Sequence, residues 1–321
     1  MHNSISLVKR FLILFICVLM FNVISRAQDH TYADTKLSAS YINPAFTGSI
    51  KGLETSSLQR IQWPHQDLNI YSHYTQITYG GGKKKWWYSG SMQHINSGGM
   101  VEIDYWSLRT CKQFSPSKNF IFRLALEGSF FKKKINYSNF SFGDEIDPHD
   151  GFVYPTNDVP RGGNISNVDF AAGISFHFFG ITIGLSSHHL TQPNSSLALG
   201  DSDIPSRLGL QASYDLPIAL KNSSTLRISP YFWWKKQMFS YWRGGLNAIW
   251  NSYYFSYGLS NNQHIMGLGY AWKSSIGFRY HFSLYQSTFA KQLLAHEVGF
   301  ELNLRNAKKE RKMNENLKGA F

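Results

Sequence analysis

The stretch "NFIFRLALEGSFF" (residues 119–131) alternates between two kinds of side chain. Its apolar positions are Phe120, Phe122, Leu124, Leu126 and Phe130. The positions between them hold Arg123, Ala125, Glu127 and Ser129. Because successive side chains of a β-strand point to opposite faces, this stretch predicts a strand with one apolar and one polar face.

The same alternation recurs along the chain. Fourteen segments follow it, near residues 52–62, 69–79, 86–95, 101–112, 119–131, 168–178, 179–188, 206–215, 224–234, 242–250, 253–260, 265–272, 275–283 and 295–304. Lengths of about 9–11 residues suit a tilted strand that crosses a membrane. Alternation alone leaves two folds open, a soluble sandwich whose polar face meets water and a membrane barrel whose polar face meets the lumen.

The connections between these segments favour the barrel. If the first strand runs outward, the odd-to-even connections are external, and they include the two longest, 132–167 and 189–205. Several even-to-odd connections are very short, for example at Phe178-Phe179 and Asn251-Ser252. Long loops at one end and tight turns at the other are typical of outer-membrane barrels. The sequence therefore predicts an all-β fold, a transmembrane antiparallel β-barrel of about 14 strands over residues 52–304.

Both ends of the chain fit an exported protein. Lys9 and Arg10 precede an apolar stretch at 11–24, and small residues occupy positions 25 and 27, so residues 1–27 are predicted to be a cleaved signal peptide. Residues 305–321 are predicted to be a basic periplasmic tail. Charged residues and aromatic residues each make up 16 % of the chain, which is poor in charge for a soluble protein. The basic residues are scattered through the strands, which argues against nucleic-acid binding.

Between the leader and the first strand, residues 28–51 contain "SYINPAFTGS" (residues 40–49). Pro44 cannot occupy the middle of a strand. A lumen of about fourteen strands is too wide for its own side chains to fill. We therefore expect the segment to plug the lumen, with contacts and turns made by Tyr41, Asn43, Pro44, Ala45, Phe46 and Gly48.

Charged residues occur on the predicted lumen face. They are Arg123, Arg207, Arg227 and Arg279, with Glu127, Asp169, Glu297 and Glu301 as possible partners. Buried charges must be paired or hydrated. The mixture of signs argues against a strongly ion-selective pore and suits a lumen closed by a plug or by loops.

No catalytic motif stands out. Four histidines are single residues on strand faces or rims, namely His177, His188, His189 and His281. The stretch "SSHHL" (residues 186–190) contains the Ser and His that a lipid-face hydrolase needs, but any strand end could contain these residue types. No cofactor is predicted with one exception. Asp144, Asp147 and Asp150 could gather oxygen ligands around Ca²⁺, although their spacing is not that of an EF-hand and a solvated loop is the simpler interpretation.

Four stretches resemble the PorP/SprF proteins of the type IX secretion system of Bacteroidota. They are "YINPAFTGS" (41–49), "DFAAGISFHFFGITIGLSSHHLTQP" (169–193), "MGLGYAW" (266–272) and "HEVGFELNL" (296–304). An Asn-Pro-Ala near the N-terminus also looks like the FadL-type fatty-acid channels, in which that segment lies within the barrel. The resemblance carries the N-terminal motif onto Tyr41 to Gly48 and a last-strand motif onto His296 and Glu297, expected at the outer rim.

The resemblance implies a non-enzymatic outer-membrane component that assists export or surface anchoring of a cognate secreted protein with a C-terminal sorting domain. The implied partners are that protein, other components of the type IX secretion system and outer-membrane lipid. Gliding or adhesive surface proteins are the implied cargo. The alternatives are a FadL-like channel for hydrophobic solutes and a soluble, adhesin-like sandwich.

Overall fold

The computed structural model describes residues 29–48, 51–66, 69–117, 119–137, 143–147, 149, 151–152, 163–197, 201–219, 225–261, 263–272, 275–286 and 293–305. The predicted signal peptide and nearly all of the predicted tail lie outside these residues. The strands are β1(Gly52–Gln62), β2(Ile70–Gly80), β3(Trp86–Ser97), β4(Val101–Ser117), β5(Phe120–Ile135), β6(Ile146–Asp147), β7(Gly151–Phe152), β8(Asn164–Phe178), β9(Ile181–His188), β10(Arg207–Tyr214), β11(Leu216–Ala219), β12(Thr225–Lys236), β13(Ser240–Trp250), β14(Tyr253–Ser260), β15(Gln263–Trp272), β16(Ile276–Tyr285) and β17(Leu293–Arg305). Two short helices precede them, α2(Ala39–Ile42) and the 3₁₀ turn η1(Pro44–Phe46).

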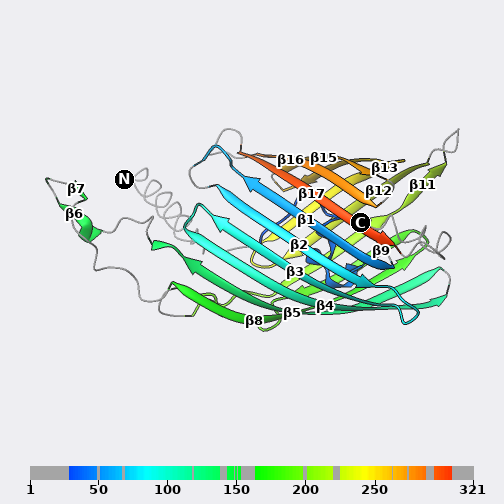
Figure 1. Ribbon diagram of the computed structural model, residues 1–321, viewed down its shortest axis with the longest axis horizontal. Helices are drawn as coiled ribbons and strands as arrows, with labels where there is room; N and C mark the ends of the chain where they lie inside the picture. Colours follow the sequence, from blue (N-terminus) through cyan, green and yellow to red (C-terminus); the bar gives the residue numbers. More distant parts are fainter. Residues whose placement is uncertain are drawn as a thin grey trace, which may run out of the picture. The chain divides into compact units, whose positions relative to one another are not determined.

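Antiparallel neighbours join the long strands into one sheet that closes on itself. The order is β10-β9-β8-β5-β4-β3-β2-β1-β17-β16-β15-β14-β13-β12-β11, and β10 also pairs with β12. β1 pairs with β17 from Gly52↔Arg305 to Gln62↔Ala295, so the first and last long strands are neighbours (Figure 1). The predicted barrel of fourteen strands is confirmed, and β11 is an extra strand that pairs only with β12 at its edge.

The two faces of the strands separate as the alternation predicts. On β5 the outward Leu126 and Phe130 are 63 % and 44 % exposed, whereas the inward Ala125 and Glu127 are 5 % and 9 % exposed. β16 repeats this pattern, with Phe278 exposed and Arg279 and His281 buried. The barrel therefore has an apolar outer wall and a polar, filled interior.

The two longest connections of the barrel lie at the same end. One end has the connections 136–163, between β5 and β8, and 189–206, between β9 and β10. We call this the loop end. The other end has turns such as 179–180 and 251–252, and we call it the turn end. The predicted loop 132–167 is too long, because β5 continues to Ile135 and β8 begins at Asn164.

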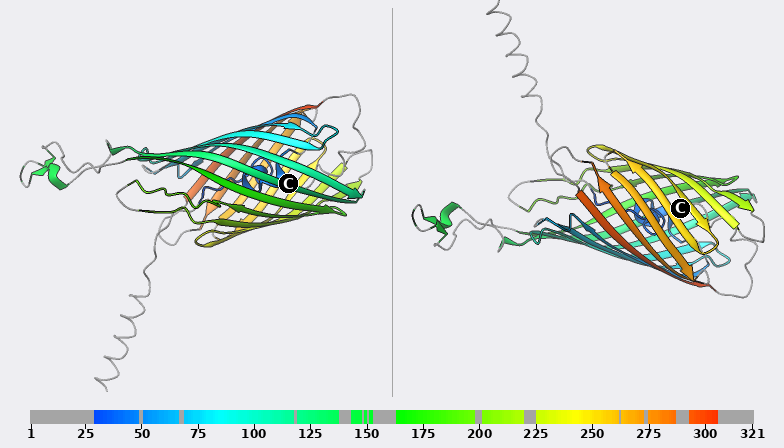
Figure 2. Two further views of the ribbon diagram at one scale, coloured as in Figure 1. Left: turned by 90° about the horizontal axis from the view of Figure 1, so that it is seen from below. Right: turned by 90° about the horizontal axis from the view of Figure 1, so that it is seen from above.

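Residues 31–48, here called the inner segment, lie inside the barrel. Their side chains and backbone contact strands from all around the wall, including β2, β5, β9, β13 and β17. Both views of Figure 2 show this segment, in dark blue, between the strands of the wall. Its helices are too short to be stable alone, so the barrel must hold them in place.

Candidate functional site

Asn43 fixes the turn of the inner segment. Its Oδ1 accepts a hydrogen bond from the N–H of Ala45 at 2.9 Å, which caps η1, while Pro44 supplies the φ angle that the first helical position requires. Its Nδ2 donates to the Leu185 carbonyl at 3.1 Å and to Gln211 Oε1 at 2.9 Å. Asn43 is fully buried, so one side chain both shapes the turn and ties it to β9 and β10.

The residues after Asn43 pack tightly against the wall. Ala45 is fully buried with Trp87, Cys111 and Ala125. Gly48 has a φ of 72°, and a Cβ at this position would lie 2.0 Å from Cδ1 of Trp87. Gly48 is therefore required both by its backbone conformation and by its close approach to β3.

Aromatic residues fix the first part of the inner segment. The rings of Tyr32, Tyr41 and Tyr74 lie 5.5–5.8 Å apart in edge-on and tilted contacts. Leu37 and Leu58 complete this cluster. Tyr41 and Phe46 were both expected to touch the inner wall. Tyr41 packs on Tyr74 of β2, and Phe46 lies so close to Gly184 of β9 that a Cβ there would come within 2.6 Å of its ring.

Glu297 is the main anchor of this segment. Its carboxylate accepts hydrogen bonds from the N–H groups of Ala33 and Asp34, both at 2.7 Å, and pairs with Arg60 at 3.2 Å. The side chain is completely buried. Glu297 therefore lies on the inward face of β17, and its expected place at the outer rim stays a prediction. His296 faces outward and contacts the Tyr280 hydroxyl at 2.7 Å.

A second buried ion pair holds Asp34. Arg279 reaches Asp34 at 3.1 Å and Glu301 at 2.5 Å, so it bridges the inner segment and β17. Burial raises the pKa of the Asp34 carboxyl. The nearby Arg279 and His281 lower this pKa, and the resulting pKa lies below its usual value. Asp34 is therefore ionised at neutral pH and bound as a carboxylate.

The other lumen charges follow two patterns. Arg123 donates to the Gly48 carbonyl at 2.8 Å, and Arg207 donates to the Tyr41 carbonyl at 3.3 Å, so both bind the backbone of the inner segment. Glu127 pairs with Arg109, not with Arg123, at 2.5 Å. Asp169 pairs with His189 at 2.6 Å. Wall residues thus satisfy some of the charges, and the inner segment satisfies the rest.

Sequence reasoning missed three arginines and one aspartate. Arg60, Arg109 and Arg243 all face inward, and Arg243 donates to the carbonyls of Tyr32 and Ala33 at 2.8 and 3.2 Å. Their alternation on β1, β4 and β13 could have revealed the arginines. No pattern in the sequence could have paired Asp34 with a residue 245 positions away.

Ser186 and His188 also belong to this interface. Ser186 Oγ donates to the Ile42 carbonyl at 3.2 Å, and His188 Nε2 lies 3.1 Å from the same oxygen. Both side chains face the lumen and not the lipid side of the wall. Two residues of the "SSHHL" stretch, Ser186 and His188, therefore hold the inner segment.

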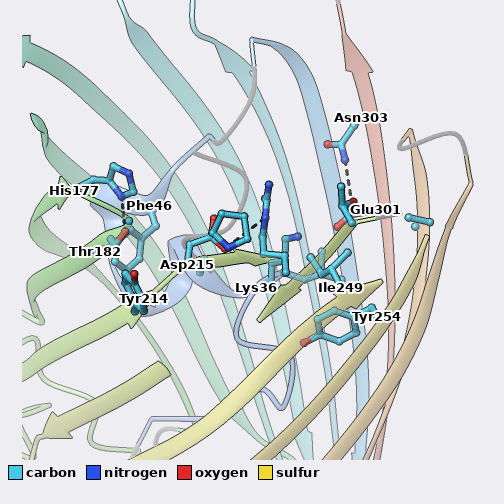
Figure 3. Close-up of a pocket in the computed structure, with 18 of the residues that line it drawn as sticks. Lys36, Phe46, His177, Thr182, Tyr214, Asp215, Ile249, Tyr254, Glu301 and Asn303 are labelled. Carbon is cyan, nitrogen blue, oxygen red and sulfur yellow. Dashed lines mark hydrogen bonds and ion pairs between the residues drawn. The ribbon is translucent and has the colours of Figure 1, made fainter. Parts of the chain in front are cut away.

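A cavity of about 1030 Å³ lies toward the turn end. Figure 3 shows Lys36 within it, between Asp215, which links β10 and β11, and Glu301 of β17. Phe46, Tyr214, Tyr254 and Ile249 supply rings and aliphatic groups to its lining. The inner segment forms one side of this cavity, which we call the chamber.

The calcium prediction stays a prediction. Asp144 lies in a 3₁₀ turn at 143–145, and Asp147 lies in β6, which pairs with β7. Asp150 lies outside the described residues. Within the described ranges, no three His, Cys, Asp or Glu side chains are grouped so that they could hold a metal ion.

The closed sheet with an apolar outer wall defines a transmembrane β-barrel, because a closed barrel satisfies every backbone hydrogen bond within lipid. Within the described part of the chain, no helix is long and apolar enough to cross a membrane. The family profile "Type IX secretion system membrane protein PorP/SprF" matches residues 24–302. The chain belongs to this family, and it is an outer-membrane component of the type IX secretion system.

Solved structures with a similar fold are other barrels. The toluene transporter TodX of Pseudomonas putida has a TM-score of 0.48 at 8 % identity, covering 86 % of this chain and 99 % of that one. The CymD monoaromatic hydrocarbon channel has a TM-score of 0.47 at 8 % identity, covering 85 % and 94 %. The outer-membrane protein Omp33 of Acinetobacter baumannii has a TM-score of 0.46 at 7 % identity, covering 80 % and 100 %. A search of curated proteins finds no significant match.

Proposed function

We propose that this protein is a non-enzymatic barrel that assists the export or surface anchoring of a cognate secreted protein, and that it does so with its loop end. The observation that supports this most strongly is the inner segment, which hydrogen bonds and ion pairs attach to strands all around the wall. A lumen occupied in this way is a poor route for a polypeptide. The secreted protein would therefore pass elsewhere and meet the barrel from outside.

The inner segment is proposed to close the lumen to solutes as well. Its attachment includes the buried ion pair Asp34–Arg279 and the backbone N–H groups of Ala33 and Asp34, which donate to the Glu297 carboxylate. Arg60 of β1 in turn pairs with this carboxylate within the wall. Buried pairs with additional hydrogen bonds are costly to break one partner at a time. Such a segment is suited to permanent closure and not to brief opening.

The loop end offers the larger surface for a partner. The connections 136–163 and 189–206 both emerge there. The described part of the second is tied to the barrel, because Asn167 Nδ2 donates to the Asn194 carbonyl at 2.8 Å and Lys133 Nζ donates to the Ser195 carbonyl at 3.2 Å. We propose that this end faces the cell exterior and contacts the secreted protein.

The test is a deletion within the longest connection. Replacing residues 138–160 by a short Gly-Ser linker preserves β5 and β8. The expected result is release of the secreted protein into the medium while the barrel remains folded. A matched control exchanges Lys83 and Lys84 for Ala at the turn end and should leave the protein on the surface. Unchanged surface retention in the deletion variant would contradict the proposal.

The chamber supports a second candidate, a channel for hydrophobic solutes. Its lining combines apolar groups, which include Tyr254 and Ile249, with charged groups such as Lys36 and Glu301, and the apolar part suits an apolar guest. Uptake of a labelled aromatic hydrocarbon into proteoliposomes distinguishes the two functions. Uptake above that of empty vesicles would favour the channel, and no uptake would favour the closed barrel.

A further inference from the structure

The outer wall of β1 and β2 has a different character from the rest of the barrel. Its outward positions are Leu53, Thr55, Ser57, Gln59 and Ile61 on β1, and Tyr71, His73, Thr75, Ile77 and Tyr79 on β2. The residues between them on β1, such as Leu58 and Arg60, are buried inside the barrel. We call Thr55, Ser57, Gln59, His73 and Thr75 the polar window.

The polar window lies within the apolar band of the wall. On β1 it is flanked by Leu53 and Ile61, and on β2 by Tyr71 and Ile77. In the strand register, the outward residues next to Gln59 on β17 and β16 are Val298 and Tyr280. Because apolar residues stand at both ends, the window lies in the hydrocarbon region and not at a headgroup boundary.

The window satisfies part of its own hydrogen-bonding capacity. Thr75 Oγ1 donates to Ser57 Oγ at 3.1 Å and lies 2.8 Å from His73 Nε2. Thr55 Oγ1 donates to the Gln76 carbonyl at 2.9 Å. Gln59 differs, because its amide is exposed and has no side-chain partner among the residues that the structure describes. A carboxamide left in hydrocarbon without a partner is unfavourable.

We propose that the polar window is an interface between two copies of this chain in the outer membrane, with Gln59 near the two-fold axis. A carboxamide carries both donors and an acceptor, so an identical Gln59 from the second copy satisfies it. The window holds no carboxylate, lysine or arginine, so two copies can meet there without like-charge repulsion. Hydrogen bonds between polar side chains also hold transmembrane helices together.

Cross-linking in native outer membranes tests the interface. Gln59→Cys is expected to give a covalent homodimer under mild oxidation, because a residue near a two-fold axis lies close to its own copy. The matched control is Leu210→Cys, an outward residue of β10 on the far side of the sheet order, and it should stay monomeric. Cys111 is fully buried and should not contribute.

A second measurement does not depend on cross-linking geometry. The double variant Gln59→Leu, Thr75→Val makes the wall more lipid-compatible, so it should fold, which heat-modified mobility on gels verifies. Its mass in nanodiscs should shift from dimer to monomer, whereas Leu246→Ala on β13 should leave the dimer intact. A monomeric wild-type protein, or a cross-link from position 59 to a different protein, would overturn the proposal.

Discussion

At the residue scale, Glu297 shows how one inward carboxylate can organise a segment that precedes it by more than 260 positions. It accepts two backbone hydrogen bonds and an ion pair while completely buried. Such a carboxylate needs all its partners, because removing one leaves the others without compensation. The Glu of the last-strand His-Glu motif is thus explained by its hydrogen bonds to the inner segment.

Glu297→Gln should loosen the inner segment. The variant leaves Arg60 without its charge partner and one backbone N–H without a full acceptor, which is expected to cost roughly 3–5 kcal/mol of stability. Urea unfolding in detergent micelles measures the change. Glu102→Gln, an outward residue of β4, is the control and should change stability by less than about 0.5 kcal/mol. Equal stability of the two variants would contradict the anchoring role.

Asp34 gives the closure a pH dependence. Its folded pKa is lowered, so its contribution to stability is fully present above the unfolded pKa of about 3.9 and is lost as the pH falls through the lower folded value. The protection of residues 31–37 against hydrogen exchange, relative to the intrinsic rate at each pH, should therefore fall below about pH 4. Asp34→Asn should show faster exchange already at neutral pH and a weaker response to acid. Protection that stays constant down to pH 2 would count against this account.

At the element scale, the turn made by Asn43 fits the wall through glycines on β8 and β9. A Cβ on Gly173 would lie 2.1 Å from Asn43 Oδ1 and 3.0 Å from the Ala45 nitrogen. The close approach of η1 to β8 therefore depends on the missing side chain. The turn at Asn43 and the glycine on β8 are therefore sterically complementary.

Gly173→Ala should displace the turn. Cys111, which is buried beneath Ala45 with its Sγ 3.6 Å from the Ala45 carbonyl, provides a native reporter. Maleimide should label Cys111 in the variant and not in the wild-type protein. Gly128→Ala is the matched control, because a Cβ there meets only the Phe170 ring at 3.6 Å. Labelling that is equal in both variants would show that the turn does not depend on Gly173.

At the scale of the whole molecule, alternation identified all fourteen barrel strands because each has one apolar face. β11 was missed, since four residues with Pro217 carry no clear period. The alternation predicts polar side chains on the inward face of β1. Leu58 is an apolar residue on that face, and it packs against Leu37 of the inner segment. Such contacts join residues far apart in the chain, so local patterns cannot predict them.

The same limit applies to the site. The Asn-Pro-Ala motif and some inward arginines, such as Arg123 and Arg279, were visible in the sequence. The lumen position of the motif was an expectation from barrel width. The partners of each group were not visible, because Asp34, Glu297 and Arg279 meet only after the sheet closes. The closed sheet is therefore what turns separate residues into one site.

Closure of the lumen by the inner segment is the claim on which the proposed function most depends. Planar-bilayer conductance tests it most directly, with the wild-type protein compared to a variant that lacks residues 32–47. The account predicts a silent wild-type protein at neutral pH and a variant with large, stable conductance steps. A wild-type protein that conducts as strongly as the deletion variant would contradict it.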